Sequence, residues 1–270
     1  MQVCYNGNFV DASSPILTAD NRGFRYGDGI FETARVANGA LLLGDFHFER
    51  LLYGLQLLQI GHAGDLGNTW LHLIIELCRL NNCTASARIR LAVFRGATGE
   101  ADYVIEANPV QPLLSTLAPQ GWTIDVYTGA SKTCDALSNL KSANYLTYVM
   151  AQRYALDKGF DECIVLNSRK FIADGSKTNL FVLQGNEVHT PPLSAGCVNG
   201  VMRRYIIRRL RALGCVVKEE DLEVADVLQA SEVFATNAVE GIRWVKSFGT
   251  KHYGNRWIEK MYFPLLENIL

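Results

Sequence analysis

Residues 161–184 have the sequence DECIVLNSRKFIADGSKTNLFVLQ. The apolar runs at the two ends, 161–167 and 179–184, are typical of buried strands. Between them lies Asp174, followed by the polar residues 176–179, and the ordinary interpretation of this part is a turn. The stretch therefore predicts a strand, a turn and a strand, and the other elements are placed outward from it.

Helices and further strands are predicted on both sides of this stretch. A hairpin is expected over 2–10, where Asn6-Gly7 separates two β-prone runs. Apolar residues at helical spacing predict a helix that starts at the N-cap Asp45 and is closed by Gly61. Other helices are predicted from Asn68 onward, over 142–158 and over 200–213, and other strands over 86–95, 102–108, 122–128 and 232–237. This mixture predicts an α/β or α+β fold with several antiparallel strand pairs.

A segment without periodicity divides the chain. Residues 108–121 contain Pro109, Pro112 and Pro119, which favours a domain boundary there. The predicted parts are a small N-terminal α/β domain over 1–112, a linker over 113–120 and a larger C-terminal domain over 121–270.

The composition excludes several classes of protein. The formal net charge is -1, from 26 basic and 27 acidic residues, so no overall field favours nucleic acid or an anionic membrane. Apolar stretches such as 113–117 are too short to span a bilayer, and the first residues show no secretory signal. The seven cysteines are scattered, so we expect reduced thiols in a cytoplasmic protein, with no disulfide framework and no metal site.

Two cations are candidates for chemistry. Lys141 lies where a predicted loop passes into a predicted helix, and the ordinary interpretation is a solvated lysine. The functional interpretation is a lysine near a pocket floor, where desolvation or a cationic neighbour lowers its pKa and lets it form a Schiff base. Arg50, on the helix that starts at Asp45, is either a solvated arginine or a bidentate partner for a phosphate.

A helix start gives a weaker signal. Residues 199–203 open a predicted helix, and its first N–H groups and positive dipole end suit a phosphate. Every helix has such an end, so the position alone does not predict a site.

The order of seven motifs is more specific than any one of them. They are 25–33 (RYGDGIFET), 45–51 (DFHFERL), 140–146 (LKSANYL), 161–167 (DECIVLN), 174–181 (DGSKTNLF), 198–203 (VNGVMR) and 236–238 (TNA). Together they resemble the class-IV, or fold-type-IV, pyridoxal-phosphate enzymes, over about Asn6 to Val245. That family includes branched-chain aminotransferases, D-amino-acid aminotransferases and aminodeoxychorismate lyases. The resemblance implies an enzyme with two α/β domains and pyridoxal 5'-phosphate between them.

The resemblance also implies roles for particular residues. Lys141 falls on the family's Schiff-base lysine and is the expected catalytic residue. Arg50 falls on the phosphate-binding arginine, and Val201 and Met202 fall where backbone N–H groups bind the phosphate. A small polar side chain that contacts the phosphate is either Thr236 or Asn237, and the sequence leaves both open.

Asp174 departs from the family pattern. It falls where the family has a glutamate, whose carboxylate pairs with the pyridine nitrogen and keeps it protonated, so that the ring is a stronger electron sink. Aspartate keeps the charge but is one methylene shorter. Three outcomes follow: the backbone moves in, a water bridges the gap, or the ring nitrogen is less well protonated.

The resemblance favours a lyase within the family. Phe31 stands where D-amino-acid aminotransferases have tyrosine, and Glu100 and Asp102 stand where their substrate-carboxylate arginine and histidine are expected. Thr33 stands where branched-chain aminotransferases usually have glycine. Residues 31–36 look more like those of aminodeoxychorismate lyases, which form 4-aminobenzoate and pyruvate. The alternative is a branched-chain-type aminotransferase that transfers an amino group to a 2-oxo acid.

The substrate and the partners are less determined. A substrate with two carboxylates needs cationic partners, and the candidates are Arg25, Arg95, Lys177 and Arg243. The family implies a homodimer, with a small-molecule amine as substrate and no role for nucleic acid or membrane. A different class also stays open, because Asp174 could mark a chain that has lost activity and serves as a scaffold.

Overall fold

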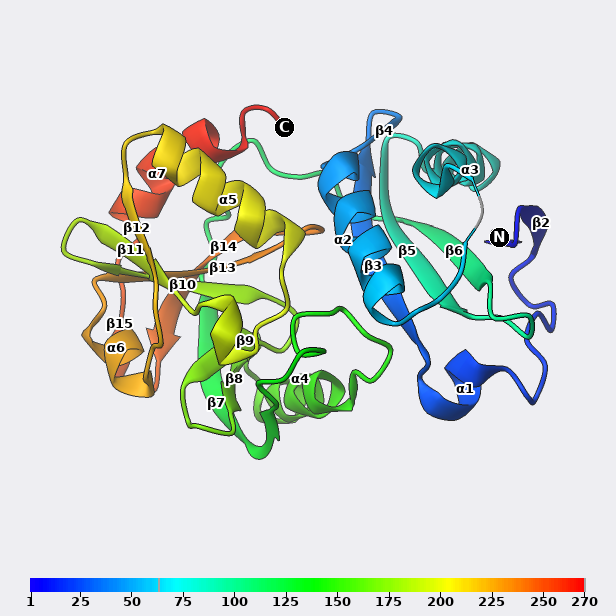
Figure 1. The fold of residues 1–270 in the computed structure, drawn as a ribbon. Coiled ribbons are helices and arrows are strands. Elements are labelled where there is room, and N and C mark those ends of the chain that lie inside the picture. Colours follow the sequence, from blue (N-terminus) through cyan, green and yellow to red (C-terminus); the bar gives the residue numbers. More distant parts are fainter. Residues whose placement is uncertain (63, 270) are drawn as a thin grey trace. The chain divides into compact units, whose positions relative to one another are not determined.

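The computed structural model describes residues 1–62 and 64–269. The chain forms two compact units (Figure 1). Unit 1 consists of Met1–Pro112 and Leu140–Asn144, and unit 2 consists of Leu113–Asn139 and Tyr145–Leu270. Each unit contains a sheet and helices, which confirms the mixed α/β class predicted from the sequence.

Unit 1 is built on an antiparallel sheet with the strand order β2-β1-β6-β5-β3-β4. Its strands are β1 (Gln2–Tyr5), β2 (Asn8–Asp11), β3 (Gly29–Ala37), β4 (Ala40–Leu41), β5 (Ser86–Arg95) and β6 (Ala101–Pro109). The predicted hairpin is confirmed. Asn6 and Gly7 both have positive φ, 47° and 84°, as a two-residue turn between twisted strands requires.

The helices of unit 1 are α1 (Arg22–Tyr26), α2 (Gly44–Leu57) and α3 (Leu66–Leu80). α2 packs against β3, and α3 packs against β1 and β6. Leu51 and Leu55 of α2 and Trp70, Ile74 and Leu77 of α3 are fully or almost fully buried in one apolar core. The helical spacing of apolar residues thus marks the buried face of α2.

The predicted ends of α2 are wrong. Its N-cap is Leu43, not Asp45, which lies in the first turn. The helix stops at Leu57, because Gln59 turns into the left-handed region at φ 53° and the N–H of Ile60 returns to Leu55 O at 3.0 Å. Gly61 therefore lies outside the helix.

Unit 2 is built on a mixed sheet with the strand order β12-β11-β10-β13-β14-β7-β8-β9, and β15 pairs with β14. Its strands are β7 (Trp122–Lys132), β8 (Glu162–Asn167), β9 (Ile172–Gly175), β10 (Asn179–Gln184), β11 (Glu187–Thr190), β12 (Val216–Glu219), β13 (Glu232–Asn237), β14 (Gly241–Phe248) and β15 (Lys251–His252). β7 runs parallel to β8 and to β14, whereas β8–β9 and β10–β13 are antiparallel.

The helices of unit 2 are α4 (Leu146–Lys158), the short η1 (Leu193–Ala195), α5 (Val201–Ala212), α6 (Val224–Gln229) and α7 (Arg256–Leu266). α4 packs on β7 and β8, and α5 and α7 pack against one another and against β13 (Figure 1). The stacked rings of Phe181 and Phe234, 4.9 Å apart, lie on the neighbouring strands β10 and β13.

The helix predicted over 142–158 starts later than expected. α4 begins at Leu146, and the preceding residues are extended and bound to β3. Lys141 O accepts from Phe31 N at 2.9 Å, and Ala143 N donates to Gly29 O at 2.9 Å. These bonds use backbone groups that a helix would need, so Lys141 does not lie at a helix entry.

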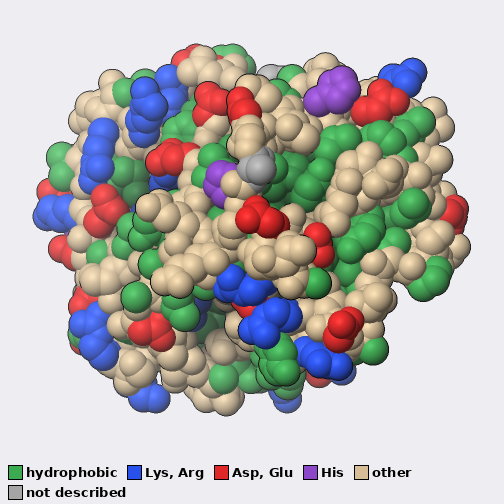
Figure 2. Space-filling view, turned by 45° about the vertical axis from the view of Figure 1, so that its right-hand side comes forward, with side chains coloured by type: hydrophobic (Ala, Val, Ile, Leu, Met, Phe, Trp, Pro, Cys, Tyr) green, Lys and Arg blue, Asp and Glu red, His purple; other side chains and the backbone are tan. Residues whose placement is uncertain are grey.

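The surface carries no field of one sign on the face drawn in Figure 2, where basic and acidic side chains are interspersed. No helix among the described residues is long and apolar enough to cross a membrane.

Candidate active site

Unit 1 buries a cluster of charged and polar side chains beside the strand β3. Glu32 lies on β3, and His47 and Arg50 lie one turn apart on α2. Arg50 donates from Nε to Glu32 Oε1 at 2.7 Å and from Nη2 to Oε2 at 2.5 Å, which is a bidentate pair. Nδ1 of His47 lies 2.6 Å from Glu32 Oε2.

The protonation states in this cluster follow from burial and pairing. Burial alone would raise the pKa of Glu32, but the charge of Arg50 and the contact with His47 outweigh it and hold the pKa at about 2. Burial lowers the pKa of His47. Glu32 is therefore ionised at neutral pH, and a neutral His47 donates from Nδ1 to it.

Lys141 belongs to the same unit. Its ammonium lies 4.6 Å from the centroid of the Phe31 ring, which is a cation–π contact. Phe31 directly precedes Glu32 on β3, and the backbone of Lys141 is bound to Phe31. Unit 1 thus gathers Lys141, Arg50, His47 and Glu32 along one strand and the helix packed on it.

In unit 2, Asp174 is fixed by three donors from a helix, a strand and the segment that precedes α5. Tyr148 of α4 donates its hydroxyl to Oδ2 at 2.6 Å, and Val198 N donates to Oδ2 at 2.9 Å. Asn179 of β10 donates from Nδ2 to Oδ1 at 2.7 Å. Asp174 is 2% exposed, so its carboxylate is anchored directly by protein groups in a buried place.

The turn that follows Asp174 is held by a second buried carboxylate. Glu162 Oε1 accepts from Ser176 N at 2.7 Å, and Oε2 accepts from Thr178 Oγ1 at 2.8 Å. The predicted turn between strands is therefore present, and Glu162 fixes it. Glu162 therefore fixes the backbone that directly follows Asp174.

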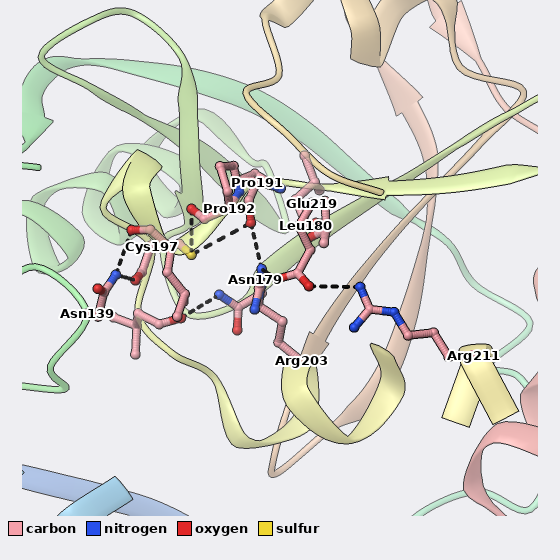
Figure 3. A network of polar contacts seen from close by, with 12 residues as sticks. Asn139, Asn179, Leu180, Pro191, Pro192, Cys197, Arg203, Arg211 and Glu219 are labelled. Carbon is pink, nitrogen blue, oxygen red and sulfur yellow. Dashed lines mark hydrogen bonds and ion pairs between the residues drawn. The ribbon is translucent and has the colours of Figure 1, made fainter. Parts of the chain in front are cut away.

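Polar contacts also hold the segment that leads into α5 (Figure 3). Asn139 donates from Nδ2 to Cys197 O at 2.6 Å. The buried Arg203, in the first turn of α5, donates from Nη2 to Pro191 O and to Glu219 Oε2, both at 2.8 Å. These contacts set the place of the N-terminus of α5.

The N-terminus of α5 and Thr236 present unused donors. The N-cap is Gly200 and has no side-chain cap. Among residues 1–62 and 64–269, the N–H groups of Val201 and Met202 have no acceptor and Thr236 Oγ1 has no hydrogen-bond partner, although all three residues are buried. Such donors, at the positive end of a helix dipole, suit a phosphate.

Asn179 connects these donors with Asp174. It is the register partner of Thr236 on β13, and its side chain bonds Asp174. A Cβ on Gly200 would lie 1.8 Å from Asn179 Oδ1, so only glycine allows α5 to begin this close. Within unit 2, a group of unused donors and a carboxylate therefore lie on either side of one asparagine.

The structure distinguishes the two residues that the sequence left open. Asn237 Oδ1 accepts from Val239 N at 2.9 Å and from Glu240 N at 2.7 Å, so it serves the turn between β13 and β14. Thr236 Oγ1, in contrast, has no hydrogen-bond partner among the described residues. This geometry favours Thr236.

The four candidate substrate cations differ in their surroundings. Arg25 is exposed and donates to Ala19 O. Arg95 is bound to Asp28 and to two carbonyls at the end of α2, which is a structural arrangement. Lys177 and Arg243 share Glu240, at 3.6 and 3.2 Å, and both lie over the Trp122 ring.

Two residues near Asp174 were missed from the sequence. Tyr148 is 3% exposed, and Lys132 lies 4.8 Å from the centroid of its ring. Lys132 ends a strand without a periodic signal, and Tyr148 is one of two tyrosines on α4. Only the tertiary fold brings them to the carboxylate.

Known proteins resemble this chain over most of its length. A family model described as amino-transferase class IV matches residues 29–248. A putative branched-chain-amino-acid aminotransferase of Methanocaldococcus jannaschii is 30% identical over 255 residues, which cover 90% of this chain and 86% of that protein. The aminodeoxychorismate lyase of Bacillus subtilis is 29% identical over 258 residues, with coverages of 93% and 88%. A hypothetical aminotransferase from Mycobacterium tuberculosis, solved in a PLP-bound form, has a TM-score of 0.84 and 19% identity, over 99% of this chain and 98% of that chain.

The pair of Glu32 and Arg50 generates a prediction about stability. Arg50→Met leaves the Glu32 charge buried without its bidentate partner, so the free energy of unfolding should fall by roughly 3–5 kcal/mol. Glu32→Gln in the same chain should recover most of that loss. Urea unfolding of the cofactor-free protein at pH 7 measures both. Arg79→Met, which breaks an exposed pair with Glu76, is the control and should change little. Equal stability of Arg50→Met and the unchanged protein would contradict the account.

The buried Asp174 generates a prediction about pH. Burial raises its pKa to about 6, against the opposing effects of Lys132 and Tyr148. Because the folded pKa is above the unfolded one, the native state binds more protons, and stability falls as the pH rises from about 4 to above 6. The size of this term is about 3 kcal/mol.

Asp174→Asn removes the titration and isolates it. Urea midpoints of the cofactor-free protein should show the variant gaining stability relative to the unchanged protein as the pH rises through this window. Parallel pH curves for the two proteins would show that Asp174 does not titrate there.

Proposed function

The chain belongs to the amino-transferase class IV family, and we propose that within it this protein is an aminodeoxychorismate lyase, which releases 4-aminobenzoate and pyruvate. The family depends on pyridoxal phosphate, so the chain is an enzyme and the scaffold alternative is set aside. The lyase is supported by residues 31–36 and 198–203, which look like those of lyases, and by the similarity to the lyase of Bacillus subtilis. The alternative is a branched-chain-type aminotransferase, which the relative from Methanocaldococcus jannaschii supports.

One observation carries the cofactor part of this proposal. In unit 2 a buried carboxylate, Asp174, lies beside Asn179, which also adjoins the unpaired Thr236 hydroxyl and the open start of α5. A cofactor that has a basic ring nitrogen at one end and a phosphate at the other matches this pairing of groups. The residues present therefore fit pyridoxal phosphate.

The family resemblance assigns cofactor contacts to residues of each unit. In unit 2, Asp174 would accept a hydrogen bond from the ring nitrogen, and Val201, Met202 and Thr236 would bind the phosphate. In unit 1, Arg50 would add a guanidinium to the phosphate, with its plane fixed by Glu32, and Lys141 would hold the cofactor covalently. When bound, pyridoxal phosphate takes up the electrons that are left when a substrate carbon loses its proton.

Lys141 and Asp174 would then divide the work. The amine of Lys141, released when the substrate amine takes its place, would remove the proton from the carbon that bears nitrogen. Asp174 would remain ionised and keep the proton on the ring nitrogen. A neutral His47 would hold Glu32 in place, and Glu32 would in turn orient Arg50. His47 would take no part in the proton transfer from the substrate carbon.

The lyase and the aminotransferase differ after this step. In the lyase, the bond from the substrate ring to the pyruvate group breaks, and the ring becomes aromatic. In the aminotransferase, a proton would be returned, hydrolysis would release a 2-oxo acid, and the amino group would pass to a second 2-oxo acid. Lys177 and Arg243, which share Glu240, are proposed partners of the substrate carboxylates.

We also propose that the protein works as a cytoplasmic homodimer. Leu146, Val149 and Met150 lie on one face of α4 at helical spacing and are 71%, 43% and 43% exposed. A second copy of the chain would cover this apolar face. All seven cysteines are free, as a reducing compartment allows.

Lys141 is the lysine expected to carry the cofactor. Borohydride reduction of the yellow holoenzyme should fix the cofactor to the peptide that contains Lys141, as peptide mapping by mass spectrometry would show. Lys141→Ala should abolish turnover but retain some cofactor, because the phosphate contacts remain. Lys158→Ala is the matched control and should keep both. A label on Lys132 or Lys170 would refute the assignment.

The reaction itself is tested by product analysis. With aminodeoxychorismate, the enzyme should form 4-aminobenzoate and pyruvate without a 2-oxo acid, since no amino group is transferred. Glutamate or leucine with 2-oxoglutarate should turn over poorly in the same preparation. Fast transamination without 4-aminobenzoate would reverse the choice in favour of the aminotransferase.

The dimer is tested by mass in solution. Met150→Glu places a charge on the apolar face of α4, so light scattering after gel filtration should show a shift from dimer towards monomer. Leu228→Asp, at an exposed leucine of α6, is the control and should stay dimeric. A dimeric Met150→Glu protein would show that the interface lies elsewhere.

A further inference from the structure

Lys132 and Asp174 lie on the two strands that flank β8. Lys132, at the end of β7, pairs with Asn167 of β8, and Lys132 O accepts from Ser168 N at 3.0 Å. Asp174, on β9, pairs with Val165 of the same central strand. The backbone of β8 therefore fixes both residues.

Tyr148 connects the two side chains. The ammonium of Lys132 lies 4.8 Å from the centroid of the Tyr148 ring, and the hydroxyl of that ring donates to Asp174 Oδ2 at 2.6 Å. Tyr145 packs on the ring, with the two centroids 4.5 Å apart. The cation of Lys132 thus contacts the phenol of Tyr148, which in turn contacts the carboxylate of Asp174.

Lys132 and Tyr148 both favour the ionised form of Asp174. A cation over an aromatic ring draws electron density towards itself, which makes the phenol a better donor to a carboxylate. The positive charge of Lys132 also favours the ionised form of Asp174 directly. Consistently, burial raises the pKa of Asp174 to about 6, whereas Lys132 and then the hydrogen bond of Tyr148 oppose that rise.

The other titratable groups that face Asp174 have less influence on its charge. Arg203 of α5 is already paired with Glu219 and Pro191 O. Cys197 has its pKa raised to about 12, mainly by burial, so it stays neutral. In the described part of the chain no carboxylate lies within ion-pair distance of Lys132. Burial lowers the pKa of Lys132, and the charge of Asp174 partly opposes this effect.

Counting acceptor positions shows where a ligand bonds. An ionised carboxylate offers about four lone-pair positions, two on each oxygen. Oδ2 accepts from Tyr148 and Val198, and Oδ1 accepts from Asn179. The remaining position is on Oδ1, so the donors fix not only the charge but also the side of the carboxylate that meets a ligand.

We propose that Lys132 and Tyr148 are positioning residues, which keep Asp174 ionised and turn Oδ1 towards the ring nitrogen of the cofactor. Lys132 acts directly and through the face of Tyr148, and Tyr148 acts by its hydrogen bond to Oδ2. The inference rests on the proposed role of Asp174. It also gives a reason why the shorter aspartate suffices at this position, because neighbouring side chains orient its carboxylate.

The test begins with the cofactor-free full chain. Aspartate labelled with 13C at the side-chain carboxyl is titrated by NMR, and Asp174→Asn identifies the signal. Lys132→Met should raise the Asp174 midpoint by one pH unit or more, a tenfold change in proton affinity, and Tyr148→Phe should raise it as well. Lys132→Arg should restore the unchanged value, and Lys158→Met is the control at an exposed lysine. If part of the Lys132 effect passes through Tyr148, the double variant should shift less than the sum of the singles.

The second part uses the holoenzyme and its absorbance between pH 5 and pH 9. Lys132→Met and Tyr148→Phe should move the spectrum towards that of Asp174→Asn, and Lys132→Arg should not. Unchanged midpoints in the cofactor-free Lys132→Met and Tyr148→Phe proteins would overturn this inference but not the proposed role of Asp174. Shifted midpoints, with holoenzyme spectra that stay the same even in Asp174→Asn, would overturn the role of Asp174 and the inference with it.

Discussion

The buried carboxylate of Asp174 is the constraint around which unit 2 is arranged. A charge taken out of water is tolerated only when several donors replace the water. Here the donors come from α4, from β10 and from the segment before α5. To bring them together, the sheet must place β9 at its edge, Glu162 must hold the next turn, and Gly200 must let α5 start against Asn179.

Unit 1 follows the same rule with a different outcome. Glu32 is also buried, but its partners are a guanidinium and an imidazole, so its pKa falls to about 2 whereas that of Asp174 rises to about 6. One carboxylate is thus charged at neutral pH and fixes Arg50. The other has a pKa near the range in which its charge responds to its neighbours, which is a feature common at functional sites.

Much of the fold could be predicted from local signals. Apolar spacing identifies α2, α3 and α5, alternation identifies β5, and a β-prone run identifies β13, because these patterns depend on nearby residues. The start of α4 could not be predicted, since residues 141 and 143 are bound to the distant strand β3. The motif order pointed to Lys141, Arg50 and Asp174, and their roles remain predictions. Lys132 and Tyr148 carry no local signal, and only the structure shows that Asn237 serves a turn whereas Thr236 Oγ1 has no partner within the described part of the chain.

The central claim is that an ionised Asp174 keeps a proton on the ring nitrogen of the cofactor. The most direct measurement is the 15N chemical shift of that nitrogen in holoenzyme prepared with 15N-labelled pyridoxal phosphate at neutral pH. The account predicts the shift of a protonated pyridine, and the loss of this signal in Asp174→Asn. The shift of an unprotonated pyridine in the unchanged enzyme would contradict it.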